Sequence, residues 1–179
     1  MDVQVIPQND IEFLKQDNIL GSGGFGVVVK VKYDGDIVAL KRTKFNATVA
    51  NQNAKLRQEA EKMSRLNHPR IVRFHGLAVC DGLVHIMMEY MEAGSLHQYL
   101  HEHASDPISC DQMWMFASDI AMGIKYLHSK NAFHQDLKAA NVLLTIVDGV
   151  PRAKLSDFGL TGMLNFSEPN PCRLDLHFD

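Results

Sequence analysis

Two stretches of the sequence decide the fold: Phe133-His134-Gln135-Asp136-Leu137-Lys138-Ala139-Ala140-Asn141-Val142-Leu143-Leu144 and, after it, Asp157-Phe158-Gly159. An acid and an amide precede an apolar, strand-like run, and a second acid follows the next such run. Asp136 is suited to be a general base, while Asn141 and Asp157 offer oxygen ligands to magnesium, which prefers few protein ligands together with phosphate oxygens. The pattern predicts a site for magnesium and phosphate with a base beside it.

Near the other end, Gly21-Ser22-Gly23-Gly24-Phe25-Gly26 fits the pattern G-x-G-x-x-G. Alone, that pattern fits a dinucleotide site, a phosphate-binding loop between two strands or a flexible turn. A dinucleotide site requires a helix after the glycines. The residues from Val27 to Val31 instead continue as a β-branched strand, which favours a hairpin. Its backbone can cover phosphates while Val28 contacts a planar base, or it can be a hairpin without a ligand.

Lys41 and Glu59 form a second candidate pair. Lys41 ends a predicted strand after the hairpin turn Asp34-Gly35, and it shares a face with Ala39. In a helix predicted over residues 48–66, Glu59 lies on or beside an apolar stripe formed by Leu56, Ala60, Met63 and Leu66. A carboxylate facing a sheet needs a partner, and Lys41 is the natural one. The alternative is that Glu59 lies on a solvated flank.

Taken in order, these motifs resemble those of a eukaryotic-type protein kinase domain, from Leu20 to about Gly162. The glycines with Val28 resemble the glycine-rich loop, Val38-Ala39-Leu40-Lys41 the lysine strand, and Gln58-Glu59-Ala60 the helix glutamate. The first of the two opening stretches resembles the catalytic loop, and the second the D-F-G motif. His68-Pro69-Arg70-Ile71-Val72 and the residues from Met91 to Leu96 are similar to tyrosine-kinase-like serine/threonine kinases.

The resemblance implies ATP and Mg²⁺ as ligands and a role for each motif residue. Lys41, braced by Glu59, would hold the α- and β-phosphates, and Asn141 and Asp157 would bind Mg²⁺. Asp136 would orient the substrate hydroxyl and accept its proton, with Lys138 near the transferred phosphate. The backbone of a hinge from Glu89 to Met91 would bind adenine, with Met88 as gatekeeper. The implied nucleotide-binding set is Gly21, Gly23, Gly26, Val28, Ala39, Lys41, Met88, Glu89, Met91 and Leu143.

Two departures from the family pattern affect what the chain is expected to do. Gln135 stands where most members carry arginine, so the cation that would pair with a phosphorylated activation loop is missing. No A-P-E motif follows Gly159 before Asp179. By resemblance, we therefore expect an incomplete large lobe, with the predicted helix from Cys110 to about Lys130 left partly uncovered and open to a chaperone or partner protein.

The expected fold is α+β and two-lobed, like a protein kinase. We predict an N-terminal extension over 1–19, a small lobe of antiparallel sheet with one helix over 20–93, a partial helical large lobe over 94–162 and an irregular tail over 163–179. Strands are predicted over 71–77 and 83–88, with Gly94 as the hinge between the lobes. The long helix has Ser109 and Gln112 in capping-box register, and its inward stripe is Met113, Phe116, Ile120, Ile124 and Leu127.

Composition fits an ordinary globular protein. The 18 basic and 21 acidic residues leave a net charge of −3, which does not favour nucleic-acid binding. The three cysteines form no C-x-x-C pair, and no apolar run approaches the roughly 18 residues that span a membrane. These features predict a reducing, cytoplasmic location.

Two hypotheses of different classes remain: a serine/threonine protein kinase in intracellular signalling, and a nucleotide-binding pseudokinase or regulatory module that transfers no phosphate. A plain structural α+β domain is the third interpretation. His97, His101 and His103 are better explained as a solvated helix end than as a zinc site, and Met113, Met115 and Met122 better as core filler than as a partner groove.

Overall fold

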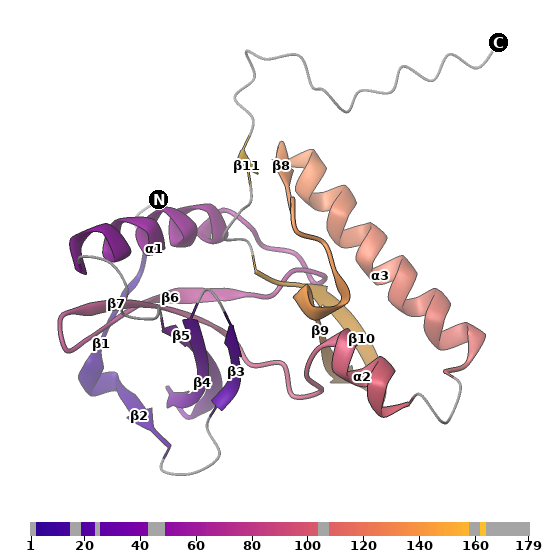
Figure 1. The fold of residues 1–179 in the computed structure, drawn as a ribbon, viewed down its shortest axis with the longest axis horizontal. Coiled ribbons are helices and arrows are strands. Elements are labelled where there is room, and N and C mark those ends of the chain that lie inside the picture. Colours follow the sequence, from indigo (N-terminus) through magenta and orange to yellow (C-terminus); the bar gives the residue numbers. More distant parts are fainter. Residues whose placement is uncertain are drawn as a thin grey trace.

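The computed structural model describes residues 3–14, 19–23, 26–42, 49–103, 108–157 and 162–163, without the side chains of 23, 49–53, 55–56 and 162–163. A curled seven-stranded sheet with one helix, α1, forms the small lobe. Two helices and two short β-pairs form the described part of the large lobe (Figure 1). The fold is thus the two-lobed α+β arrangement that the motifs predicted.

The small-lobe sheet is built from hairpins. Its five central strands are β3 (Ile19–Gly23), β4 (Gly26–Tyr33), β5 (Asp36–Arg42), β6 (Phe74–Cys80) and β7 (Leu83–Glu89). The β4–β5 turn has Asp34 at φ 50° and Gly35 at φ 87°, as a tight hairpin requires. The strand order is β1-β6-β7-β5-β4-β2, with β3 on β4.

The predicted strand over 71–77 begins three residues later in the structure, at Phe74. Ile71 instead forms a parallel bridge with Leu155 in the other lobe, and the Val72 amide donates to the Leu155 carbonyl at 2.9 Å. Residues 71–72 therefore pair with the end of β10 and do not form part of β6.

Residues 5–13 join the sheet at both of its edges. β1 (Val5–Pro7) pairs in parallel with β6, the single turn η1 (Gln8–Asp10) follows, and β2 (Ile11–Phe13) pairs antiparallel with β4. A Cβ on Gly76 would lie 2.8 Å from the Gln4 carbonyl oxygen, so the missing side chain there makes room for the approach to β6. The predicted extension is thus partly a component of the sheet.

Two apolar cores lie on opposite faces of the sheet. Along β5, Ala39 belongs to the inner core while Val38 and Leu40 belong to the outer core, as strand alternation dictates. The inner core is covered by α1 (Val49–Ser64), from which Ala60 and Met63 are buried. The outer core is Ile6, Ile11, Val29, Val31, Val38, Leu40, Ala78, Cys80 and Met87.

The large-lobe part is a hairpin flanked by helices (Figure 1). Its elements are α2 (Leu96–Glu102), α3 (Cys110–Ser129), β8 (Ala132–Phe133), η2 (Ala139–Asn141), β9 (Val142–Val147), β10 (Val150–Leu155) and β11 (Gly162–Met163). β9 pairs antiparallel with β10, and β11 with β8. Of the tail expected over 163–179, Met163 belongs to β11 and the rest lies outside the described residues.

The capping box predicted at the start of α3 is only half formed. At α3, Ser109 Oγ accepts the Gln112 amide at 3.1 Å, but the Gln112 side chain donates to the Pro151 carbonyl instead of completing a capping box. A complete box, unforeseen, starts α2 at Ser95 and Gln98.

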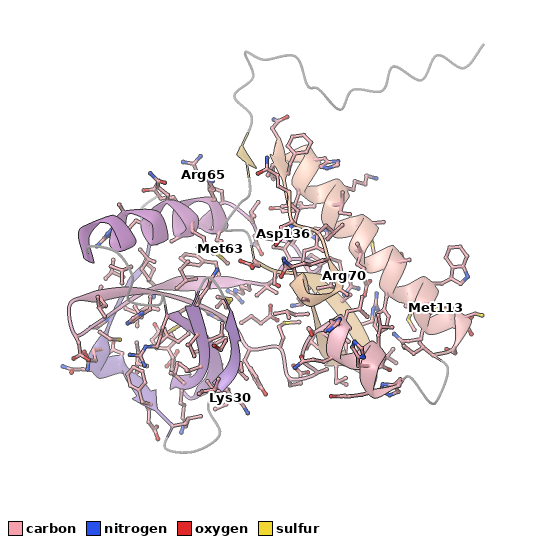
Figure 2. The ribbon with its side chains drawn as sticks, viewed as in Figure 1. Lys30, Met63, Arg65, Arg70, Met113 and Asp136 are labelled. Carbon is pink, nitrogen blue, oxygen red and sulfur yellow. The ribbon has the colours of Figure 1, made fainter. Side chains whose placement is uncertain are left out.

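One member of the α3 stripe, Met113, was assigned wrongly. Phe116 and Leu127 are buried, but Met113 is 52% exposed (labelled in Figure 2). It lies in the first turn, where Gln112 makes the contact with β10. Trp114 and Met122 are also exposed, and Met115 is half-buried but belongs to neither core. The prediction that these methionines fill the core is therefore wrong.

Candidate functional site

Lys41 is the centre of a small charged cluster between the lobes. Near the end of β5, it lies opposite Val28 of β4 and Ile86 of β7. Its Nζ is 2.8 Å from Glu59 Oε1 on α1 and 3.1 Å from Asp157 Oδ1 after β10. The Lys41 and Glu59 side chains are only 11% and 13% exposed, so the pair that helical spacing predicted is formed and largely buried.

The two carboxylates decide the charge of the amine. Burial alone would lower the pKa of Lys41, but the charges of Glu59 and Asp157 and their hydrogen bonds outweigh it, so the pKa is raised. The ammonium ion therefore stays charged at neutral pH and is held by both lobes, in the state needed to bind phosphate oxygens.

A tight turn presents the acid of the catalytic-loop stretch. The Asp136 amide donates to the His134 carbonyl at 2.8 Å, which closes a three-residue turn around Gln135 at φ 59°, a left-handed conformation unusual for a residue other than glycine. Lys138 Nζ lies 2.7 Å from Asp136 Oδ2, and Asn141 Nδ2 donates to Asp136 Oδ2 at 3.0 Å. The three predicted site residues of this loop are thus brought together.

These contacts set the basicity of Asp136. The hydrogen bond from Lys138, followed by that from Asn141, lowers its pKa despite the opposing effect of burial. A carboxylate with a lowered pKa is a weak base, better suited to orienting a hydroxyl than to removing its proton early.

The loop is fastened to the strand that leads to Asp157. His134 Nε2 lies 2.7 Å from the Ser156 carbonyl oxygen, and both the amide and the hydroxyl of Ser156 donate to the Asn141 carbonyl at 2.9 Å. Asp157 follows directly, at φ 60°. The positions of Asn141 and Asp157 are therefore coupled through the backbone, although 16 residues separate them in the sequence.

The donor set fits magnesium. Asn141 uses Nδ2 for its hydrogen bonds, and Asp157 uses Oδ1, which leaves Asn141 Oδ1 and Asp157 Oδ2 without hydrogen bonds among the described residues. Two such oxygens, one of them charged, match a cation that takes few protein ligands. Within the described part of the chain, no group of three or more His, Cys, Asp or Glu side chains could hold a metal.

The apolar residues assigned to the nucleotide lie together. Ala39, Met88 and Met91 are buried in the inner core, and Val28 and Leu143 pack against it. They supply an apolar surface of the kind that a planar base requires.

The glycines of the predicted phosphate loop differ in whether their position requires a glycine. A Cβ on Gly21 would meet nothing within 4 Å, so packing among the described residues does not require a glycine there. Gly26 has φ 137°, a backbone conformation that only glycine adopts without strain. Gly23 ends β3 opposite Gly26. Phe158 and Gly159 of the D-F-G stretch lie outside the described residues.

The hinge segment is fixed at both ends. Glu89 Oε1 pairs with Lys154 Nζ at 2.5 Å, and Glu89 Oε2 accepts the Arg73 amide at 3.1 Å. The Ala93 amide donates to the Leu144 carbonyl, and the Gly94 carbonyl accepts the Leu144 amide on β9. Gly94, expected to be the hinge itself, is thus tied to the large lobe.

A buried carboxylate that sequence analysis missed supports this arrangement. Asp119 on α3 is 0% exposed and accepts from Arg70 Nε at 2.8 Å, from Arg152 Nη2 at 2.7 Å and from the Ala153 amide at 3.0 Å. The Arg70 carbonyl in turn accepts the amide of Leu155, two residues before Asp157. The sequence did contain a signal for this residue: Asp119 is an acid on the buried stripe of α3, which includes Phe116, Gly123 and Leu127.

The histidines of α2 make no metal cluster among the described residues. The rings of His97 and His101 meet edge to face at 4.5 Å, while His103 Nδ1 lies 2.9 Å from the Tyr99 carbonyl oxygen. Cys80 and Cys110 are free. None of the described helices is long and apolar enough to cross a membrane.

Comparison with known proteins agrees with the geometry. The family model described as protein tyrosine and serine/threonine kinase matches residues 14–172. The chain belongs to the protein kinase family. It is 40% identical over 143 residues to the dual specificity testis-specific protein kinase 1 of Rattus norvegicus, covering 79% of this chain and 22% of that protein.

Other relatives are plant kinases. The chain is 36% identical over 152 residues to the leucine-rich repeat receptor-like protein kinase PXC2 of Arabidopsis thaliana, with 84% of this chain and 15% of that protein covered. It is 38% identical over 172 residues to the serine/threonine-protein kinase-like protein CCR4 of the same plant, with 88% and 22% covered. These names agree with the predicted tyrosine-kinase-like serine/threonine group. The chain spans less than a quarter of the length of each of these three relatives.

Proposed function

We propose that the chain binds ATP with Mg²⁺ and that the protein transfers the γ-phosphoryl group to serine or threonine hydroxyls, in intracellular signalling and in the cytoplasm. The observation that carries the proposal is the double pairing of Lys41 with Glu59 and Asp157. An apolar side chain would pack at least as well here, because burying Lys41 and Glu59 as charged groups costs free energy. The pairing is explained if the ammonium ion has to be charged and held in a fixed position before phosphate binds.

Each residue then has a distinct task. Lys41 binds the α- and β-phosphates and Glu59 orients it, while Asn141 and Asp157 hold Mg²⁺, which neutralises charge on the phosphates when bound. Asp136 orients the acceptor hydroxyl and takes its proton as the oxygen attacks. Lys138, bonded to Asp136 at 2.7 Å, is close enough to the attack site to stabilise the transferred group, which supports a serine/threonine acceptor.

Three substitutions separate these tasks. Lys41→Met and Asp157→Asn should each lower ATP affinity in the presence of Mg²⁺, because they remove a phosphate or metal contact. Asp136→Asn should leave ATP affinity nearly unchanged and abolish phosphoryl transfer, because Asp136 meets only the acceptor. Lys32→Met and Asp148→Asn, at exposed positions, are the matched controls.

The measurement is thermal unfolding and calorimetry with ATP and Mg²⁺, followed by transfer to serine, threonine and tyrosine peptides. At a nucleotide concentration of 100 times Kd, binding should stabilise the chain by about 2.7 kcal/mol. No stabilisation at millimolar ATP would refute the nucleotide site. Binding without transfer to any peptide would identify the chain as the nucleotide-binding regulatory module instead, and transfer to tyrosine as well would widen the acceptor class.

A further inference from the structure

Lys30 of β4 lies on the same sheet face as the proposed nucleotide residues. Residues directly opposite each other in antiparallel strands share a face, and the registers pair Val28 with Lys41, Lys30 with Ala39, and Ala39 with Met88. A row of three side chains therefore runs across the sheet from Lys30 through Ala39 to Met88. The hinge begins immediately after Met88.

At the end of this row, Lys30 reaches the hinge. Its Nζ lies 5.2 Å from the ring centroid of Tyr90, within the range of a cation–π interaction. Both side chains are half-buried, and Ala39 between the strands is small enough to let a lysine pass over it. None of the carboxylates among the described residues forms an ion pair with Lys30, so the aromatic ring is its described charge partner.

We propose that Lys30 and Tyr90 form a latch that holds β4, the strand leading out of the glycine-rich turn, onto the hinge, and that this latch positions both for nucleotide binding. The latch rests on the nucleotide site proposed above. Lys41, in the next row on this face, ties the sheet to α1 and Asp157. The latch joins β4 to the hinge, on the side of Ala39 away from Lys41. No hydrogen bond or ion pair joins the described residues of β4 to the hinge.

The latch couples two side chains in nucleotide binding. Lys30→Met keeps the aliphatic chain and removes the charge, and Tyr90→Leu removes the ring. Each should weaken ATP binding about two- to fivefold, the lower end of the range for cation–π pairs, because both side chains remain partly in contact with water. The double variant should lose no more ATP affinity than either single variant, because the first substitution already removes the interaction that the second would remove. Lys30→Arg and Tyr90→Phe, which keep cation and ring, should bind as the unaltered chain does.

Lys32→Met is the matched control for charge. Lys32 lies two residues along β4 on the same face, opposite Ile37, and its Nζ is 3.9 Å from Glu12 Oε2. The control removes the same charge without touching the latch, so it should leave ATP affinity unchanged.

Calorimetric titration with ATP and Mg²⁺ on the whole chain decides between the outcomes. Equal losses in Lys30→Met and Lys32→Met would show a general charge effect and overturn the latch. So would additive losses in the double variant, or a loss in Lys30→Met alone, which would mean direct contact with the nucleotide. Absence of binding by the unaltered chain would refute the proposed function itself, whereas binding that ignores both latch substitutions refutes only the latch.

Discussion

Substituting Asp119 by asparagine would test whether the buried carboxylate on α3 holds the large-lobe hairpin in place. The side chain is 0% exposed and joins two arginines and a backbone amide, from a loop and from β10. The asparagine side chain would keep the volume but present an amide group to donors. Breaking one partner of a buried ion pair costs about 3–5 kcal/mol. Arg70 and Arg152 are 16% and 26% exposed and can turn partly to water, so we expect about 3 kcal/mol.

Urea unfolding measures this cost. With a dependence on urea of about 2 kcal/mol/M, the midpoint should fall by about 1.5 M. Asp148→Asn is the control, since it makes the same chemical change at an exposed turn residue beside β10. Its free energy of unfolding should change by less than about 0.5 kcal/mol. A loss below about 1 kcal/mol in Asp119→Asn would refute the structural role of the carboxylate.

The pH dependence supplies an independent check. Burial would raise the pKa of Asp119, but the Arg152 hydrogen bond, the Ala153 amide and the charge of Arg70 outweigh it and lower the pKa. A carboxyl with a lowered pKa in the folded state stabilises the fold above its ordinary pKa, and this contribution disappears as pH falls through the lowered value. The asparagine variant should therefore lose less stability on acidification than the unaltered chain.

Two further predictions concern the sheet. His85, 3% exposed on β7, has its pKa lowered to about 4 from 6.5, mainly by burial and also by the charge of Arg42. The unfolded chain therefore takes up a proton first, and stability should fall by about 2 kcal/mol between pH 7 and pH 5, a loss that His85→Gln should reduce in urea unfolding. Gly76→Ala would place a Cβ 2.8 Å from the Gln4 carbonyl oxygen. It should cost about 1–3 kcal/mol and expose residues 3–13 to limited proteolysis, and an unchanged cleavage pattern would contradict the docking of β1.

The charged site could be predicted because its signals are local. Glu59 lies on or beside a helical stripe that faces the sheet, and Lys41 lies on the sheet face that the helix meets. Spacing therefore offered the pair, with a solvated Glu59 as the alternative, and the neighbouring motifs favoured the pair. The catalytic loop is likewise continuous in sequence. The long helix was predicted within one residue of its end for the same reason, since its stripe repeats over successive turns.

The remaining features depend on distant partners that no periodicity reveals. β1 is three residues long and pairs with a strand some 70 residues away. The sequence carries a single trace of this pairing, the glycine at position 76, where a side chain would collide with the segment before β1. Asp119 shared with Glu59 the signal of an acid on an apolar stripe, yet its arginines lie 49 residues before it and 33 after it. Met113 satisfied the helical period and is exposed, because a stripe is buried only where something covers it.

The two buried carboxylates act on opposite sides of one strand end. Glu59 fixes Lys41 against Asp157 from the small lobe, while Asp119 fixes Arg70 and β10 from the large lobe (Arg70 is labelled in Figure 2). Between them, Leu155 is bonded on both its amide and its carbonyl to the segment 70–72, and Ser156 is bonded to Asn141. Asp157 is therefore positioned from both lobes, and the contacts of Asp119 and Arg70 contribute to this without involving any of the proposed ligand-binding residues. If Asp157 is the Mg²⁺ ligand proposed above, a small displacement of it should weaken binding. Asp119→Asn should then reduce the gain in ATP affinity that Mg²⁺ gives, under conditions where the variant stays folded. A calorimetric titration of the folded variant that matches the unaltered chain would show that Asp119 does not position Asp157.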